Sequence, residues 1–312
     1  MDENSILIVG SIALDTIKTP FGEKKEILGG SAVYAGLSAS FYKKNVNLLG
    51  VVGSDFPQKH IKFLESYGIN TEGIEKQQGK TFRWDGYYEY DMNQAHTVKT
   101  KLNVLATFNP KLLPRHKACK YVFLANFDPD LQLEVLSQLK DPKIVAVDTM
   151  DYWIKNKRKS LHKIVKAADV ILMNDSEIRQ FMETPNIPIA ARRLIELGAK
   201  SVIVKKGEHG ALFFTESTHF SAPSYPQEFF RDPTGAGDSF AGGFIGYLAK
   251  TGDLSQENFK KSIIIGSVMA SFNVEDFSVE RLKTLKHKEI VKRFEMIRRF
   301  SEFEPLSISN WM

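Results

Sequence analysis

The 312-residue chain is long enough for one or two domains with large cores. Its composition, 43% apolar and 25% charged residues, is that of a soluble globular protein, and the absence of a run of about 18 apolar residues argues against a membrane-spanning helix. A net charge of +5 leaves nucleic acids among the candidate partners, whereas an N-terminus without a signal-peptide pattern and a single cysteine, Cys119, favour a protein of the reducing cytoplasm.

Short apolar runs alternate with helical patterns along most of the chain. The apolar runs predict buried strands at 6–10, 46–53, 121–126, 143–148, 169–174 and 201–207. The segments between them predict helices at 31–44, 57–67, 130–140, 156–167, 175–183 and 188–198. Such an alternation indicates an α/β fold in a single domain over 1–312, with a doubly wound, mainly parallel sheet and helices on both faces. Ligands of these sheets bind beyond the carboxyl ends of the strands, so the polar residues that close the strands are functional candidates.

The segment 80–105 breaks this alternation. Aromatic residues recur there at every second position, at Phe82, Trp84, Tyr88 and Tyr90. Charged residues lie between them, which predicts an antiparallel hairpin with one aromatic face. We expect a small β lid made of two inserted segments, at approximately 12–28 and 80–106. The lid has two candidate roles: it covers a substrate, or it joins two copies of the chain in a homodimer.

The last predicted element is a C-terminal helix over 281–299, where apolar residues recur at helical spacing. This stretch carries eight Lys or Arg and two Glu, an excess larger than the net charge of the whole chain. A basic, solvated helix face explains the excess. No aromatic platform or known nucleic-acid motif accompanies it, so we expect neither a nucleic acid nor a membrane as partner.

The stretch RDPTGAGDSF, residues 231–240, contains a predicted turn followed by a helix over 238–250. Small residues at 235–237 let the backbone turn tightly and point its N–H groups at one spot, and such a spot attracts anions. Asp238 follows at once, although it is itself an anion. It has two interpretations: an acid that satisfies the helix dipole, or a group that takes part in chemistry beside a bound phosphate.

Several stretches resemble the motifs of the ribokinase-like (PfkB) carbohydrate kinase family. DPTGAGDSFAGGF, at 232–244, is similar to the C-terminal signature of that family. Further similar stretches occur in the family's order and spacing: GSIALD near the start, GGSAVYAG at 29–36, GVVGSD at 50–55, NDSE at 174–177 and KKGEHGA at 205–211. The resemblance covers nearly the whole chain, and it implies a ribokinase-like fold and an ATP-dependent kinase.

On the phosphate side, the resemblance implies that the turn holds the transferring phosphoryl group. Gly235, Ala236 and Gly237 would stabilise charge on the phosphoryl oxygens, and Thr234 would lie at the nucleotide. Asp238 would be the general base that takes the proton from the attacking hydroxyl, which explains a carboxylate beside a phosphate cradle.

Two further motifs would complete the nucleotide site. Asn174 and Glu177 match the family's Asn-x-x-Glu motif, which helps to place hydrated Mg²⁺, although a capped helix N-terminus is the alternative. Lys205 and Gly207 would contact the nucleotide. The family usually has a hydroxyl residue at position 205, so this lysine either binds phosphate as a point charge or is solvated. The family often uses a monovalent cation near the turn, and FNVEDFS, at 272–278, leaves K⁺ dependence open.

On the acceptor side, Asp15 matches the family's substrate-binding aspartate, whose carboxylate accepts hydrogen bonds from hydroxyl groups. Gly29 and Gly30 would allow close approach to the substrate. Tyr34 stands where many sugar kinases have an asparagine. Asn126 stands where members of the family place a polar residue that contacts the substrate.

Together these features predict transfer of the γ-phosphoryl group of ATP to a sugar or sugar-like substrate, with a pentose- or hexose-like hydroxymethyl acceptor favoured. A nucleoside kinase of the same fold is an alternative, because a flat base wants an aromatic wall. A catalytically silent ligand-binding regulator is a second alternative, and the intact turn argues against it. The sequence has no P-loop, no zinc-ligand spacing and no G-x-S-x-G elbow.

Overall fold

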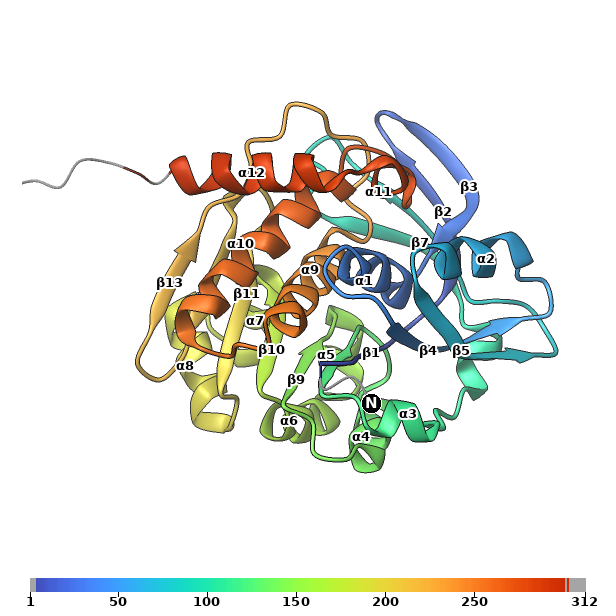
Figure 1. Ribbon diagram of the computed structural model, residues 1–312, viewed down its shortest axis with the longest axis horizontal. Helices are drawn as coiled ribbons and strands as arrows, with labels where there is room; N and C mark the ends of the chain where they lie inside the picture. Colours follow the sequence, from blue (N-terminus) through green and yellow to red (C-terminus); the bar gives the residue numbers. More distant parts are fainter. Residues whose placement is uncertain (1–3, 301, 303–312) are drawn as a thin grey trace, which may run out of the picture.

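The computed structural model describes residues 4–300 and 302, and its centre is a large sheet (Figure 1). The strands of this main sheet are β1 (Ile6–Val9), β4 (Val46–Gly53), β5 (Ile69–Gln77), β8 (Tyr121–Leu124), β9 (Ile144–Asp148), β10 (Val170–Asn174), β11 (Ser201–Lys205), β12 (Ala211–Phe214) and β13 (His219–Ala222). They are arranged in the order β13-β12-β11-β10-β9-β8-β1-β4-β5. All neighbours from β11 to β5 are parallel, whereas β12 pairs antiparallel with both β11 and β13. The predicted mainly parallel sheet is therefore confirmed.

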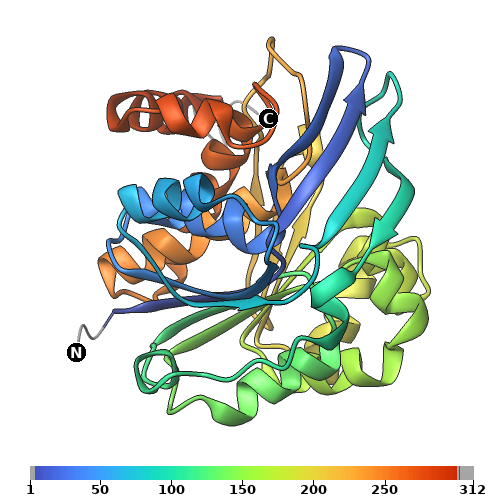
Figure 2. The same ribbon diagram turned by 90° about the vertical axis from the view of Figure 1, so that its right-hand side faces the viewer.

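Helices cover both faces of the main sheet (Figure 2). One layer contains α1 (Ser31–Ser40), α2 (Gln58–Ser66), α9 (Ala236–Thr251), α10 (Gln256–Asn273), α11 (Glu280–Thr284) and α12 (His287–Arg299). The other contains α4 (Pro129–Gln138), α5 (Asp151–Asn156), α6 (Arg158–Ala167), α7 (Asp175–Met182) and α8 (Ile187–Leu197). Short elements are α3 (Pro114–Lys117), η1 (Asn103–Thr107) and η2 (Gly207–His209). Ile6 and Ile8 of β1 lie in the first core and Leu7 and Val9 in the second, because successive strand residues face opposite sides.

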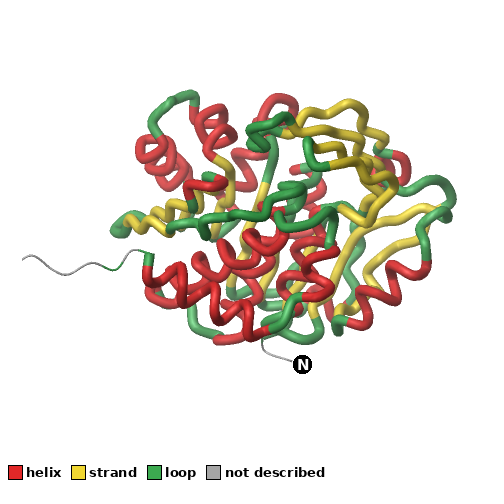
Figure 3. Tube along the Cα trace, turned by 90° about the horizontal axis from the view of Figure 1, so that it is seen from above, coloured by secondary structure: helices red, strands yellow, loops and turns green. Residues whose placement is uncertain are grey.

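Four strands form a second, separate sheet. They are β2 (Ala13–Thr19), β3 (Gly22–Gly29), β6 (Arg83–Tyr88) and β7 (Ala95–Lys101), in the order β3-β2-β6-β7. The pairs β2–β3 and β6–β7 are antiparallel hairpins, and β2 and β6 pair in parallel. The two segments that were expected to form a lid thus build one sheet, which stands apart from the central strands (Figure 3).

The aromatic face of this second sheet is shorter than predicted. Strand β6 ends at Tyr88, and Tyr90 lies in the following turn with 90% of its surface exposed. The prediction was wrong for Tyr90 because alternation was continued past the end of the strand. Trp84 and Tyr88 remain partly buried on β6.

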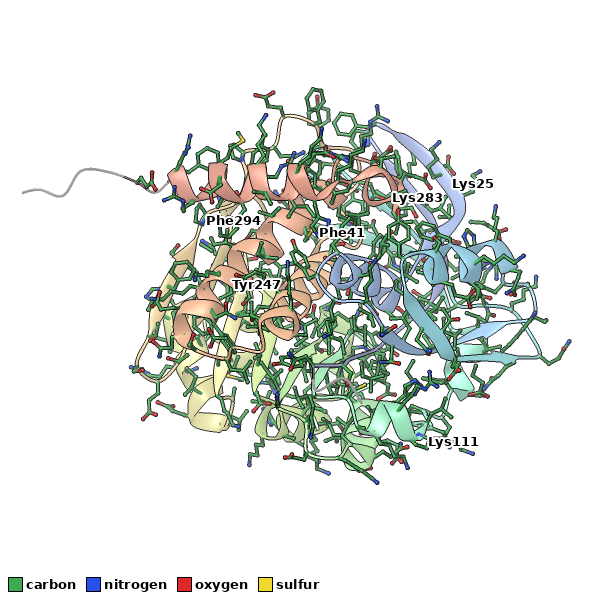
Figure 4. The ribbon with its side chains drawn as sticks, in the orientation of Figure 1. Lys25, Phe41, Lys111, Tyr247, Lys283 and Phe294 are labelled. Carbon is green, nitrogen blue, oxygen red and sulfur yellow. The ribbon has the colours of Figure 1, made fainter. Side chains whose placement is uncertain are left out.

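The C-terminal basic stretch differs from the prediction in two ways. It forms two helices, α11 and α12, because Leu285 is extended and Lys286 starts a new helix with its N–H donated to the Glu289 carboxylate at 3.0 Å. Its basic side chains are also only partly solvated, since Arg293 donates to Glu275 at 2.7 Å. Phe294 of α12 packs partly buried against the core below it (Figure 4).

The sequence prediction lacked the outer strands β5, β12 and β13, helix α10, and the short elements α3, α5, η1 and η2. Buried residues occur on most sides of α10, so its sequence lacks the one-sided apolar pattern by which a surface helix is found. Within residues 4–300 and 302, no helix is long and apolar enough to cross a membrane.

Candidate active site

The turn before α9 depends on the glycine at position 235. Gly235 has a φ of 77°, in the left-handed region that favours glycine. A Cβ atom there would also collide with the ring of Tyr34, which lies directly against the turn. Both the backbone angle and the close approach of Tyr34 therefore require glycine.

The turn presents free N–H groups. The amides of Ala236 and Ser239 donate to carbonyl groups of the turn, at 3.1 and 2.8 Å. In the part of the chain that the structure describes, the amides of Gly237 and Asp238 have no acceptor. Unpaired amides at the N-terminus of a helix form a binding site for an anion such as a phosphoryl group. The turn therefore has the free N–H groups that the predicted cradle requires.

Lys205 brings a positive charge to this cradle. Its ammonium group lies 3.0 Å from the place that a Cβ atom on Gly237 would occupy, and it donates to Asp148 Oδ2 at 2.5 Å. Only 16% of the lysine side chain is exposed, so the alternative of a solvated lysine is wrong. Asp148 was not named from the sequence. Its one signal was its place as the polar residue that closes strand β9.

Asp238 carries a carboxyl group suited to general-base chemistry. Burial, and to a smaller degree the charge of Asp148, raise its pKa to about 7 against the opposing effect of the Lys205 ammonium. A base whose pKa lies near the working pH accepts a proton efficiently and is also available in its charged form.

Asn174 and Glu177 form the N-terminus of α7. The Asn174 N–H donates to Glu177 Oε2 at 2.7 Å, and the Glu177 N–H donates to Asn174 Oδ1 at 2.8 Å. This is a capping box, the structural alternative considered from the sequence. The other Glu177 oxygen has no hydrogen bond among the described residues. Burial raises the pKa of Glu177 to about 8, while Lys205 opposes this rise.

The oxygen atoms of Asn174 and Glu177 decide how this site can bind Mg²⁺. Among the described residues, no group of three or more His, Cys, Asp or Glu side chains could hold a metal ion directly. Mg²⁺ retains several waters and is bound mainly by substrate phosphates in many kinases. The free oxygen of Glu177 fits a contact through water, whereas a direct protein cage does not fit.

The acceptor side contains two buried polar atoms without partners. Asp15 is 4% exposed and Tyr34 is 1% exposed, and neither Asp15 Oδ1 nor the Tyr34 hydroxyl has a hydrogen-bond partner among the described residues. Burial raises the pKa of Asp15 to about 8; a backbone hydrogen bond from Trp84 opposes the rise. Gly29 is required because the Asp15 carboxylate occupies the place of its Cβ atom. Unpaired buried polar atoms are costly, so this pair indicates a ligand rich in hydrogen-bonding groups.

The remaining predicted residues have different surroundings. Gly30, with a φ of 98°, is the N-cap of α1. Asn126 accepts a hydrogen bond from Trp153 Nε1 at 3.1 Å, and its amide nitrogen lies 3.1 Å from Met150 Sδ. Both polar groups of Asn126 are thus engaged within the protein. Gly207 has a φ of 55° and starts η2.

The second sheet touches the turn through Thr234. The Thr234 hydroxyl and the Tyr88 hydroxyl lie 3.2 Å apart. Asp232, which is fully buried, accepts the N–H groups of Thr234 at 2.9 Å and of Ser278 at 3.3 Å. The turn is therefore held from the second sheet and from the segment after α10.

Comparisons with known proteins show the family of this chain. The model of the pfkB family of carbohydrate kinases matches residues 21–284. A cytidine kinase of Thermococcus kodakarensis is 30% identical over 246 residues, which is 77% of this chain and 87% of that protein. A deoxyribokinase of Salmonella typhi is 25% identical over 250 residues, 77% of this chain and 80% of that protein.

Solved structures share the fold. The nucleoside kinase of Methanocaldococcus jannaschii, an archaeal member of the ribokinase family, superposes with a TM-score of 0.75 at 23% identity, covering 94% of this chain and 98% of that one. The resemblance found in the sequence, the ribokinase-like fold and the kinase activity that they imply are confirmed. The chain belongs to the pfkB family of carbohydrate kinases.

Proposed function

We propose that this kinase transfers the γ-phosphoryl group of ATP to the hydroxymethyl group of a nucleoside. The observation that carries the proposal is the pair of unpartnered buried atoms, Asp15 Oδ1 and the Tyr34 hydroxyl, next to the anion cradle. A ribose ring supplies hydroxyl donors for Asp15 and acceptors for Tyr34. The relatives named as cytidine and nucleoside kinases support this choice over the free sugar that the sequence favoured.

Two features support a nucleoside over a small sugar. The partly buried Trp84 and Tyr88 add aromatic surface on the second sheet, which suits a flat base. Asn126, the expected sugar contact, is engaged by Trp153. A free pentose remains the second candidate because two of the related proteins are deoxyribokinases.

The proposed reaction uses the groups of the cradle in order. Asp238 accepts the proton of the attacking hydroxyl, whose oxygen forms a bond to the γ-phosphorus while the bond from that phosphorus to the β-γ bridging oxygen breaks and ADP leaves. The amides of Gly237 and Asp238 and the Lys205 ammonium stabilise the charge on the phosphoryl oxygens. Asn174 and Glu177 would hold the water ligands of Mg²⁺, which when bound would neutralise phosphate charge.

We also propose a monovalent cation beside Asp232. Asp232 is a buried carboxylate whose pKa is raised by burial, and the described residues give it backbone N–H donors but no cationic side chain. A monovalent cation such as K⁺ would offset this buried charge. We also propose a single ribokinase-like domain in the cytoplasm, with the second sheet as the lid and as the contact in any homodimer.

The test is ADP release in the presence of Mg²⁺ and ATP with a panel of cytidine, other nucleosides, ribose and deoxyribose. We expect kcat/KM for the best nucleoside to exceed that for either free sugar by at least about 10-fold, since losing the base removes buried aromatic contacts. Asp238→Asn serves as the inactive control. Faster turnover of a free sugar than of every nucleoside would contradict the nucleoside assignment while leaving the kinase assignment intact.

A further inference from the structure

Asn273, the last residue of α10, forms hydrogen bonds to the active-site turn. It is fully buried, although its side chain is an amide. Its nitrogen donates to the Thr234 carbonyl at 2.8 Å, and its oxygen accepts the Ser239 hydroxyl at 3.0 Å. The amide therefore bridges the residues on either side of the segment 235–238.

The Thr234 carbonyl, to which Asn273 donates, lies four residues before Asp238. In a regular α-helix, each N–H donates to the carbonyl four residues earlier. The Thr234 carbonyl is consequently the acceptor that the Asp238 N–H would use if α9 continued one residue toward its N-terminus. The next bond in the series, from the Ser239 N–H to the Gly235 carbonyl, is present at 2.8 Å. The helical pattern thus begins immediately after the place where Asn273 binds.

We propose that Asn273 is a positioning residue that keeps the Asp238 N–H free for the transferring phosphoryl group. By holding the Thr234 carbonyl, its amide competes with the intrahelical bond for this acceptor and fixes the direction of the turn. A free N–H that is already aimed at the phosphoryl oxygens needs no rearrangement at the moment of reaction. A side chain without a donor at position 273 lets the Asp238 N–H close the regular helical bond instead.

Asn273→Leu tests this role, because Leu has the branched shape of Asn, is somewhat larger, and has no hydrogen-bonding group. The inference rests on the proposed function of the turn as the phosphate cradle. Two quantities are measured: hydrogen exchange of the Asp238 amide, with and without Mg²⁺ and a nonhydrolysable ATP analogue, and the separate values of kcat and KM for the acceptor. In the wild-type protein we expect fast exchange without nucleotide and slow exchange with it.

In Asn273→Leu we expect the Asp238 amide to exchange slowly even without nucleotide. We also expect kcat to fall by roughly 100-fold, the scale of losing one preorganised donor, with the KM for the acceptor changed less than about 3-fold. Asn273→Ala is the second variant; it also lacks the donor and covers the case in which Leu does not fit.

Ser38→Ala is the matched control. Ser38 is also fully buried and donates to the Ser239 carbonyl at 2.6 Å, so its loss weakens the same first turn of α9 without releasing the Thr234 carbonyl. Its kcat should stay within about 3-fold of wild type. If the variants at 273 match Ser38→Ala in kcat and match wild type in exchange, Asn273 is only structural. If nucleotide fails to protect the wild-type amide, the cradle itself is wrong.

Discussion

Replacing Asp238 by Asn should make the enzyme inactive and more stable at once. Folding raises the pKa of this carboxyl group from 3.8 to about 7, chiefly by burial. Each pKa unit corresponds to about 1.4 kcal/mol, so keeping the group ionised in the folded protein costs about 4 kcal/mol above pH 7. Asn has nearly the same shape and no charge. We therefore expect a gain of a few kcal/mol in the free energy of unfolding of the ligand-free protein at pH 8, with kcat lowered by at least about 100-fold.

The change of this stability difference with pH tests the argument most directly. The cost is absent below about pH 4, where Asp238 is protonated in both states, grows between pH 4 and 7, and is complete above pH 7. Urea unfolding of the wild type and Asp238→Asn should give curves that differ most at pH 8 and converge toward pH 4. An equal stability at pH 8, or a difference that does not change with pH, would refute the argument from burial. Wild-type turnover would refute the role as base.

Three further experiments examine the rest of the site. The kcat/KM of the wild type should rise with pH, with the midpoint of the rise near pH 7. Lys205→Met should move this midpoint to higher pH and lower the plateau roughly 100-fold, because the ammonium favours the ionised base. A midpoint at lower pH in Lys205→Met contradicts this role of Lys205. Glu177→Gln should raise the Mg²⁺ concentration for half-maximal rate, and an unchanged titration would leave Glu177 as a helix cap only. Asp15→Ala should raise the KM of the acceptor at least about 10-fold, measured by initial rates, with an unchanged KM counting against substrate contact.

Local patterns in the sequence determined most of the core. The alternation of apolar strands and amphipathic helices gave the parallel sheet, because both are repeating patterns within short segments. The small residues at 235–237 and the following Asp238 likewise predicted the turn, since backbone freedom and helix start are local properties. Elements that lack one-sided patterns, such as α10 and the outer strands, were missed for the same reason.

Only the tertiary structure decided which distant side chains meet. Asp148 reaches Lys205 because β9 and β11 flank β10 in the sheet, and no short-range pattern encodes that order. Asn273 reaches the Thr234 carbonyl because α10 packs against α9. That the Tyr34 hydroxyl is buried without a hydrogen-bond partner among the described residues follows only from the folded structure. Burial, charge neighbours and hydrogen-bond partners are properties of the assembled fold, so the chemistry of this site depended on the structure.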